Sequence, residues 1–394
     1  MTTRVLLVEL AHPPGAAEYT VHDRLVRSSA GAPDPVVALT LSSRPGAARR
    51  VGGSPAPGRG TRGLRRMLVF GRSCGLIWRS TLRARAFKPT LVYSSQQTFD
   101  VAVAAVLGRL CAAPRIVHLH YAYGPWLGRL ATRLTKSATH VVAVSEFCRQ
   151  TALLRGLDPA RVSTVANGWG PALATAGATT LRRSDLGIGE DDPLVAVVGR
   201  LDLAKGHDLL LRALPAVVRD VPRVRVLVCG ESRHSPGWDA QLQAMSQTLG
   251  LGEHVRWLGQ RSDISQLLPL CDVFCLPTEM EPFGLVFLEA MAAQLPVVAL
   301  RSGAVPEVVV DGGTGLLSYP GDVEALAGNL TRLLLDPGLA ARLGRAGRER
   351  LASQFDGADA ARRWRVVLRS VAAGIGAGTG SSRRIPHRRG GARS

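Results

Sequence analysis

The chain has 394 residues, of which 46% are hydrophobic, and this is enough for two globular domains with separate cores. No stretch reaches the roughly 18 apolar residues of a membrane-spanning helix, and the first ten residues lack a signal-peptide pattern, so we expect a cytoplasmic protein. The formal net charge is +19, which points to an anionic partner and not to a cationic one.

The first half of the chain alternates short apolar runs with segments of helical character, which predicts a doubly wound parallel sheet. The predicted strands cover residues 5–10, 36–41, 91–94, 115–120, 141–144 and 162–165. One predicted helix ends near residue 27, and two others cover residues 64–87 and 99–111. Residues 64–87 place arginines between apolar positions. This fits a helix on a membrane surface or, as we favour, a core-packed helix with a solvated basic face.

The positive charge lies almost entirely in this half. Residues 1–185 hold 25 basic and 8 acidic residues, a balance of +17, and the rest hold 24 and 22, a balance of +2. We expect peripheral contact with an anionic membrane, at its inner face, through the basic N-terminal half. The alternative is compositional, because only three of the 49 basic residues are lysines, as in an arginine-rich bacterial proteome.

The alternation restarts in the second half of the chain. Its predicted strands cover residues 194–198, 224–229, 255–258, 272–276 and 297–300, and its helices 209–218, 322–335, 338–352 and 357–373. The predicted division is a first domain at 1–175, a crossing at 176–192, a second domain at 193–355, a C-terminal helix at 356–374 that returns to the first domain, and a disordered basic tail at 375–394. The six cysteines are scattered through apolar segments, which favours buried thiols over disulfides or a zinc site.

Two carboxylates frame the turn after the buried strand at 272–276. Glu281 lies in the loop, and Glu289 lies two turns along a helix that we expect to begin at Pro282. The N–H groups at the start of this helix belong to Phe283, Gly284 and Leu285. These groups and the helix dipole favour a phosphate, and carboxylates beside them can accept from sugar hydroxyls. The stretch therefore indicates a nucleotide-sugar site, although a capped helix with two solvated acids is the simpler alternative.

Other candidate residues follow predicted strands in both halves of the chain. Arg200 and Lys205 flank a glycine loop after the strand at 194–198, as two cations on a diphosphate would. His120 ends a strand, and ligands of open α/β sheets bind beyond such ends, so it is a better candidate than His118. A glycine-containing loop at Gly15 follows the first strand and can hold phosphate.

Several motifs of the second half occur together, in order and at the usual distances. They are Val198-Gly199-Arg200-Leu201 with Lys205-Gly206, Glu281-Pro282-Phe283-Gly284 with Glu289-Ala290-Met291-Ala292, Pro306-Glu307-Val308-Val309, and Asp311-Gly312-Gly313-Thr314-Gly315 with Pro320-Gly321-Asp322. With these motifs the chain resembles the retaining glycosyltransferases of family 4, strongly over residues 194–325 and more loosely over 1–170. The resemblance implies the GT-B fold, in which two Rossmann-like domains face each other across a cleft.

The resemblance also implies which residues form the site. The residues expected to act in catalysis are Glu281, His120, Arg200 and Lys205. The residues expected to bind the donor are Gly15, Ala16, Arg200, Lys205, Phe283, Gly284, Leu285 and Glu289. Arg261 and Leu267 are expected to border the base.

Each of these residues has an implied role. Arg200 and Lys205 would hold the donor diphosphate, and Glu289 would take the ribose hydroxyls. Glu281 would bind hydroxyls of the donor sugar, and His120 would approach that sugar from the first domain. Gly15-Ala16-Ala17 stands where the family commonly has a Gly-Gly pair.

The implied reaction moves a hexose or related sugar from a nucleoside-diphosphate sugar to a hydroxyl, a hexosyltransferase reaction of class EC 2.4. Retention is expected from same-face attack, in which the leaving phosphate takes the acceptor's proton. The chain has no Asp-x-Asp motif, so we expect no divalent metal in catalysis. We also expect no cofactor beyond the donor and no nucleic-acid partner.

The sequence leaves open the donor base, the donor sugar and the acceptor, which could be a polysaccharide, a lipid-linked sugar or a small natural product. Bacterial cell-envelope or natural-product glycosylation would use any of these. The alternatives are a nucleotide-sugar epimerase or a phosphorylase on the same fold, and a non-catalytic basic adaptor that binds membranes or nucleic acid. A phosphorylase would need a pyridoxal-phosphate lysine, and the chain holds only three lysines.

Overall fold

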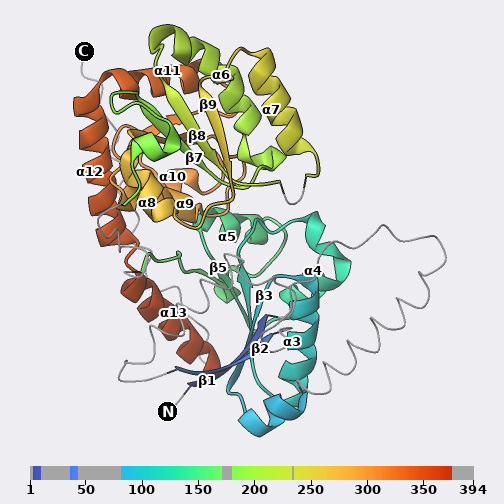
Figure 1. Cartoon of the computed structure of the whole chain (residues 1–394). Coiled ribbons are helices and arrows are strands. Elements are labelled where there is room, and N and C mark those ends of the chain that lie inside the picture. The colour runs from blue at the N-terminus through green and yellow to red at the C-terminus, as the bar shows by residue number, and fades with distance from the viewer. Residues whose placement is uncertain (1–2, 10–35, 43–80, 171–179, 233–234, 375–394) are drawn as a thin grey trace, which may run out of the picture.

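The computed structural model describes residues 3–9, 36–42, 81–170, 180–232 and 235–374. These residues form two parallel six-stranded sheets, one from each half of the chain, and each sheet is covered by helices (Figure 1). This is the two-domain Rossmann-like α/β architecture that the sequence predicts. Among the described helices, none combines the length and the apolar character needed to cross a membrane.

The first sheet has the strand order β2-β1-β3-β4-β5-β6. Its strands are β1 (Thr3–Glu9), β2 (Val36–Ser42), β3 (Leu91–Ser95), β4 (Arg115–Leu119), β5 (His140–Ala143) and β6 (Val162–Thr164). Residues 81–87 are helical, and the helices that follow are α3 (Thr98–Leu110), α4 (Gly128–Lys136) and α5 (Glu146–Leu153), with a 3-10 turn at Pro125–Leu127. All five residues of β3 are buried, as expected of a strand covered on both faces.

The second sheet has the strand order β12-β11-β10-β7-β8-β9. Its strands are β7 (Leu194–Val198), β8 (Arg225–Cys229), β9 (Val255–Gly259), β10 (Val273–Leu276), β11 (Val297–Leu300) and β12 (Gly315–Ser318). Its helices are α6 (His207–Asp220), α7 (Trp238–Thr248), α8 (Ile264–Leu267), α9 (Leu285–Ala292), α10 (Val305–Val308), α11 (Val323–Leu335) and α12 (Pro337–Gln354). The order reverses between β7 and β10, and this switch point is where such sheets bind ligands.

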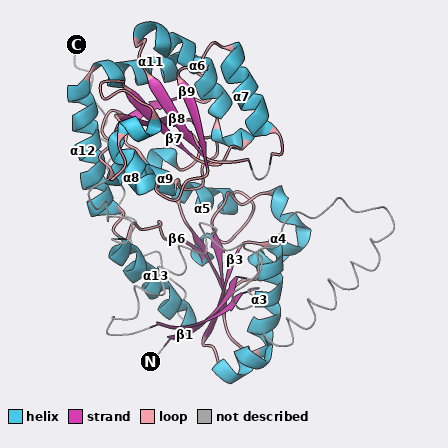
Figure 2. Ribbon diagram, viewed as in Figure 1, coloured by secondary structure: helices cyan, strands magenta, loops and turns pink. Residues whose placement is uncertain are grey.

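The C-terminal helix α13 (Gly357–Ala372) leaves the second domain and packs against the first sheet. Trp364 of α13 is fully buried in a cluster with Val5 and Leu7 of β1. The alternate residues of β1, such as Leu6, contact helix α3 instead. Figure 2 accordingly shows α13 on one side of the first sheet and α3 and α4 on the other. The boundaries predicted for the domains stay a prediction.

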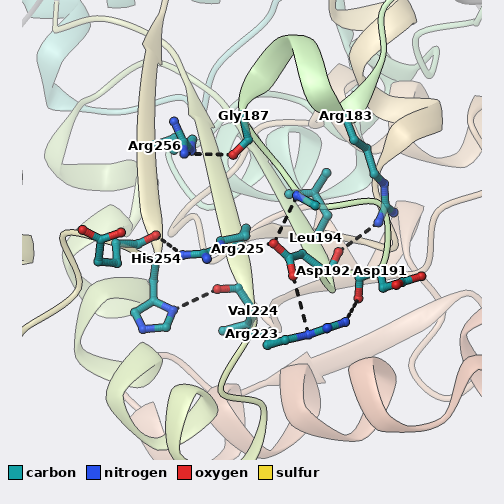
Figure 3. Close-up of polar contacts among 12 residues, drawn as sticks. Arg183, Gly187, Asp191, Asp192, Leu194, Arg223, Val224, Arg225, His254 and Arg256 are labelled. Carbon is teal, nitrogen blue, oxygen red and sulfur yellow. Dashed lines mark hydrogen bonds and ion pairs between the residues drawn. The ribbon is translucent and has the colours of Figure 1, made fainter.

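A polar cluster fastens the segment before β7 to the second sheet (Figure 3). Arg183 donates to the carbonyl oxygens of Glu190 and Asp192 at 2.7 and 2.9 Å, and it pairs with Asp272 at 3.1 Å. The carboxylate of Asp192 in turn accepts from Arg225 at 3.4 Å. Because these residues precede or begin strands, the cluster lies at the amino ends of the sheet, away from the switch point, and its role is structural.

One expected helix starts later than predicted. The helix placed at Pro282 begins at Leu285, because Gly284 has a φ of +86°, a left-handed conformation that interrupts the helix. The predictions for the loop with Gly15 and Ala16, the helix ending near residue 27, residues 64–80 and the tail 375–394 lie outside the described residues. Four of the five described cysteines are buried, as expected.

Candidate active site

The candidate site lies where the strand order of the second sheet reverses, between β7 and β10. Strand β7 continues into the loop that carries Arg200 and Lys205, and the neighbouring strand β10 continues into the loop that carries Glu281. Both loops leave the carboxyl ends of adjacent parallel strands, so they meet at one edge of the sheet. The fold therefore brings together three residues that the sequence predicts for one site.

Lys205 and Glu281 form a close ion pair. The Lys205 Nζ lies 2.6 Å from Glu281 Oε2, and the Thr278 hydroxyl lies 3.0 Å from the same oxygen. The side chains of Lys205 and Glu281 are only 19% and 9% exposed. A mostly buried pair with additional hydrogen bonds is held in one geometry, so both charges are positioned before any ligand binds.

The backbone around Glu281 is clamped as well. The Glu281 carbonyl oxygen accepts from the Ala304 N–H at 2.8 Å. The preceding residue, Gly303, has a φ of +58°, and a Cβ there would lie 2.5 Å from the same carbonyl oxygen. Only glycine allows this close approach of the two loops. Neither Thr278 nor Gly303 is among the predicted site residues, because each acts only through a contact that the fold creates.

Arg200 lies in the same loop as Lys205 but is more accessible. Its Nε lies 3.0 Å from Asp202 Oδ2, and its side chain is 44% exposed. Both cations predicted to hold a diphosphate therefore contact a carboxylate. An anion at this site would share Lys205 with Glu281 and could draw the exposed Arg200 away from Asp202, at little cost in stability.

The start of α9 supplies backbone donors beside this ion pair. Gly284 is the N-cap residue, and among the described residues no side chain accepts from the first N–H groups of the helix. The Phe283 ring is buried against Phe355, with ring centroids 5.8 Å apart, so it positions the turn through packing. Leu285 and Glu289, one turn apart in α9, are both half-buried. The arrangement favours an anion at this helix end.

His120 belongs to the first domain and directly follows β4. It is buried, and its ring centroid lies 4.1 Å from that of His118. His118 is held from the other side by Tyr93, whose hydroxyl lies 2.6 Å from His118 Nδ1. His118 thus belongs to a buried network, whereas His120 lies at the strand end, as the sequence predicts.

The two domains touch next to Glu281. Ser145 follows β5, the strand beside β4, and its hydroxyl donates to the Pro282 carbonyl oxygen at 2.6 Å. This contact places the carboxyl end of the first sheet, where His120 lies, opposite the loop of Glu281. The site is therefore built from both halves of the chain.

A second contact between the domains involves Glu307. Its carboxylate accepts from the N–H groups of Glu146 and Phe147 at 2.8 and 2.7 Å, at the start of α5. Burial raises the pKa of Glu307, and the two N–H bonds act against this rise. The sequence places Glu307 in a motif but indicates no role for it, because its partners lie 161 and 160 residues away along the chain.

One of the two expectations for the base-binding side is wrong. Leu267 is fully buried and presents no surface to a ligand, so it does not border the base. Arg261 pairs with Asp263 through hydrogen bonds of 2.8 and 2.5 Å, and its contact with the base stays a prediction. Cys148 also lies near the site, with its Sγ 3.6 Å from the Pro282 carbonyl oxygen. Burial raises the pKa of this thiol to about 12, so it is uncharged near neutral pH.

Comparison with known families matches both halves of the chain. The model described as Glycosyltransferase Family 4 matches residues 21–171, and the model described as Glycosyl transferases group 1 matches residues 179–350.

Among curated relatives, the chain is 34% identical to the alpha-maltose-1-phosphate synthase of Mycolicibacterium smegmatis over 270 residues, which cover 64% of this chain and 68% of that protein. It is 39% identical to the GDP-mannose-dependent alpha-(1-6)-phosphatidylinositol monomannoside mannosyltransferase of the same species over 177 residues, 42% of this chain and 44% of that one. It is also 33% identical to the D-inositol 3-phosphate glycosyltransferase of Segniliparus rotundus, over 48% of this chain and 43% of that protein.

Solved structures share the whole architecture. The structure of Anabaena HepE in complex with UDP and glucose has a TM-score of 0.76 and 22% identity, and the match covers 93% of this chain and all of that one. Sucrose-phosphate synthase from Thermosynechococcus elongatus has a TM-score of 0.74 and 22% identity, over 94% of this chain and all of that one. At this identity the likeness concerns the fold.

Proposed function

The chain belongs to glycosyltransferase family 4 and has the GT-B fold, and from this premise we propose that it is a retaining hexosyltransferase. The donor is a nucleoside-diphosphate sugar, and the acceptor is a hydroxyl of a polysaccharide, a lipid-linked sugar or a small natural product. The observation that carries the proposal is the Lys205–Glu281 pair, 2.6 Å apart, at the switch point of the second sheet and next to the start of α9.

The donor diphosphate is proposed to lie between the loop after β7 and the start of α9. Lys205 and Arg200 supply positive charge, and the backbone N–H groups near Gly284 donate hydrogen bonds. When the bond between the sugar and the diphosphate breaks, negative charge develops on the leaving phosphate. Donors that are positioned in advance stabilise that charge, and they do so with protein groups alone.

The sugar is proposed to lie between Glu281 and His120. Glu281 accepts hydrogen bonds from sugar hydroxyls, since the ion pair with Lys205 holds its carboxylate in one orientation. The same ion pair makes Glu281 a poor nucleophile. We therefore propose same-face attack, in which the acceptor oxygen bonds to the anomeric carbon, the diphosphate leaves from that face, and its oxygen takes the acceptor proton.

The donor base is proposed to be uracil or guanine. The relatives include a GDP-mannose-dependent enzyme, and a structure of the same fold binds UDP and glucose. Glu289, one turn into α9, is proposed to bind the ribose hydroxyls, which both donors have in common. The choice of acceptor depends on the first domain.

The proposal is tested first by thermal unfolding in the presence of UDP, GDP, ADP and their sugars. A ligand that binds only the native state raises the melting temperature according to its affinity. We expect one base to give a clear shift that disappears in Lys205→Met. The absence of a shift with every nucleotide, in a folded sample, would contradict the donor site.

A second experiment separates transfer from the alternatives. With the donor identified, the anomeric configuration of the product is read by NMR with a panel of hydroxyl acceptors. Retained configuration supports the proposal. Conversion of the donor to its epimer without any acceptor would indicate an epimerase, and nucleotide binding without any turnover would indicate an adaptor.

A further inference from the structure

The outer side of helices α3 and α4 exposes large apolar side chains to solvent. On α3 these are Phe99, Val106 and Leu110, and on the turn before α4 and in α4 they are Trp126 and Leu130. The exposed fraction ranges from 36% for Phe99 to 58% for Leu130. Buried residues such as Ala104 and Gly108 occupy the opposite side of α3. A contiguous set of exposed apolar side chains on a folded domain marks a contact surface.

The two helices form one surface. The Thr98 hydroxyl, at the start of α3, donates to the Leu127 carbonyl oxygen at 3.2 Å, which brings Phe99 and Trp126 to neighbouring positions. Figure 1 shows α3 and α4 on the side of the first sheet away from α13. We call this surface the α3–α4 face. It consists of the exposed apolar residues Phe99, Val106, Leu110, Trp126 and Leu130 and the exposed basic residues Arg109, Arg129, Arg133 and Lys136.

The charged residues of the α3–α4 face are all basic. Arg129, Arg133 and Lys136 lie four and three residues apart, so they share one side of α4. The chain has no aspartate or glutamate between residues 101 and 145. The α3–α4 face therefore combines exposed apolar side chains with cations that no nearby acidic residue in the sequence neutralises.

From these observations we infer that the α3–α4 face docks on the surface of an anionic lipid bilayer. The cations lie at the level of the lipid phosphates, and the apolar side chains enter the boundary between headgroups and acyl chains. A second copy of the chain is the wrong partner, because a symmetric contact would bring the same cations together. Nucleic acid would match the cations, but the aliphatic side chains of Val106, Leu110 and Leu130 would gain nothing from it.

The position of this face gives the inference a consequence for the enzyme. Its end with Phe99 and Trp126 lies next to the carboxyl ends of β3 and β4, where His120 lies. The Tyr121 N–H, one residue after His120, donates to Gln96 Oε1 at 3.2 Å and ties these two loops together. A bilayer on the face would thus lie beside the acceptor side of the site. The docking inference does not rest on the donor chemistry, so each can fail without the other.

The test is flotation of the full chain with vesicles of phosphatidylcholine alone or an equimolar mixture with phosphatidylglycerol. We expect binding to the anionic vesicles only, weakened by salt. The variant Arg129→Glu/Arg133→Glu should lower the partition coefficient by at least about tenfold, since each basic residue near the surface contributes to attraction. The variant Leu110→Ser/Leu130→Ser should lower it without changing the charge.

Matched controls lie in the second domain. Arg342→Glu/Arg345→Glu changes the charge of the exposed side of α12 by the same amount, and Leu335→Ser removes an exposed leucine at the end of α11. Both should bind vesicles like the wild type. Unchanged melting temperatures verify that every variant is folded.

Three outcomes would overturn the inference. The first is equal vesicle binding by Arg129→Glu/Arg133→Glu and its control, which would assign binding to another basic part of the chain. The second is the absence of binding to anionic vesicles at low salt. In the third, the variants of the α3–α4 face keep their binding to vesicles but lose either self-association, seen by light scattering, or binding to duplex DNA.

Discussion

Lys205 and Glu281 are 76 residues apart in sequence, and their charged atoms lie 2.6 Å apart in the fold. The pair joins the loops that follow β7 and β10, and its stability depends on both partners. Removing one charge of a mostly buried pair leaves the other without compensation, which is costlier than removing both.

We expect Lys205→Met to destabilise the protein by about 3 kcal/mol, because Glu281 then remains buried without its cation. Transfer should fall by at least about a hundredfold in kcat, the usual effect of losing one donor to developing charge. Thermal unfolding and an assay with the identified donor measure both effects. The double variant Lys205→Met/Glu281→Gln should recover stability but not activity.

A matched control is Arg212→Met on α6. Arg212 pairs with Asp208 at 2.7 Å, but its side chain is 51% exposed, so stability should change by less than about 0.5 kcal/mol. Full activity of Lys205→Met would refute the assignment of this pair to the site.

Gly303→Ala should displace Glu281. The new Cβ would lie 2.5 Å from the Glu281 carbonyl oxygen, and the backbone would also keep a φ of +58°. We expect a loss of stability above 2 kcal/mol, about 1 to 2 of which comes from the left-handed backbone, and a tenfold or larger loss of kcat/KM. Gly312→Ala is the control. It has a φ of +68° with open space around the Cβ, so it should show the backbone cost alone and keep its activity.

Glu307→Ala should loosen the contact between the two domains. It removes the acceptor of two hydrogen bonds at the start of α5, each worth about 1.5 to 3 kcal/mol when one partner is charged. We expect kcat/KM to fall by at least about tenfold and the radius of gyration, measured by X-ray scattering, to increase. Glu324→Ala, at an exposed position in α11, should change neither quantity. An unchanged radius in Glu307→Ala would mean that other contacts hold the domains.

Buried parallel strands were the easiest elements to predict from the sequence. The bounds of β7 and β11 match the prediction to the residue, because each is an uninterrupted apolar run that is buried on both faces.

Helices α4, α5 and α7 were not predicted. Helix α4 is mostly polar and begins at a glycine without a side-chain cap, so its helical state depends on packing against α3 more than on local pattern.

The candidate site could likewise be predicted only in part from the sequence. Arg200, Lys205 and Glu281 could each be placed after a strand, because polar residues and glycine follow apolar runs in the sequence. Their pairing could not be predicted, since it depends on β7 lying beside β10, and strand order leaves no local signal. For the same reason the contacts of Glu307 with the start of α5 appear only when the two domains are assembled.

Acid should destabilise the protein through His140. Burial lowers the pKa of this histidine to about 4, with Arg161 as a second cause, and it is about 6.5 when unfolded. The unfolded state therefore binds the proton first, so the free energy of unfolding is highest above pH 6.5 and falls as the pH drops toward 4. The contribution of His140 is about 3 kcal/mol.

Denaturant unfolding from pH 7.5 to 4 checks this with His140→Gln, which should reduce the dependence on pH. Part of the pH dependence should persist in this variant, because burial also lowers the pKa of His207 to about 4. Ser163→Ala removes the hydrogen-bond partner of His140 and should lower stability at every pH. An identical pH dependence in His140→Gln and wild type would contradict the prediction.

The C-terminal helix should influence His120 through a buried chain of contacts. Trp364 Nε1 donates to the Tyr93 hydroxyl at 3.0 Å, and that oxygen lies 2.6 Å from His118 Nδ1. Because the indole N–H can only donate, the Tyr93 oxygen accepts from it. The second contact of this oxygen, with His118 Nδ1, fixes the orientation of the His118 ring, which packs against His120.

Trp364→Phe keeps an aromatic ring in the core but removes the donor to Tyr93. We expect a loss of about 1 to 2 kcal/mol in stability, a kcat at least about threefold lower, and a shift in the pH profile of kcat because the orientation of His120 changes. A purely structural role would lower the melting temperature and leave that profile in place. Trp257→Phe, in β9 of the second domain, is the matched control and should change neither kcat nor its pH profile.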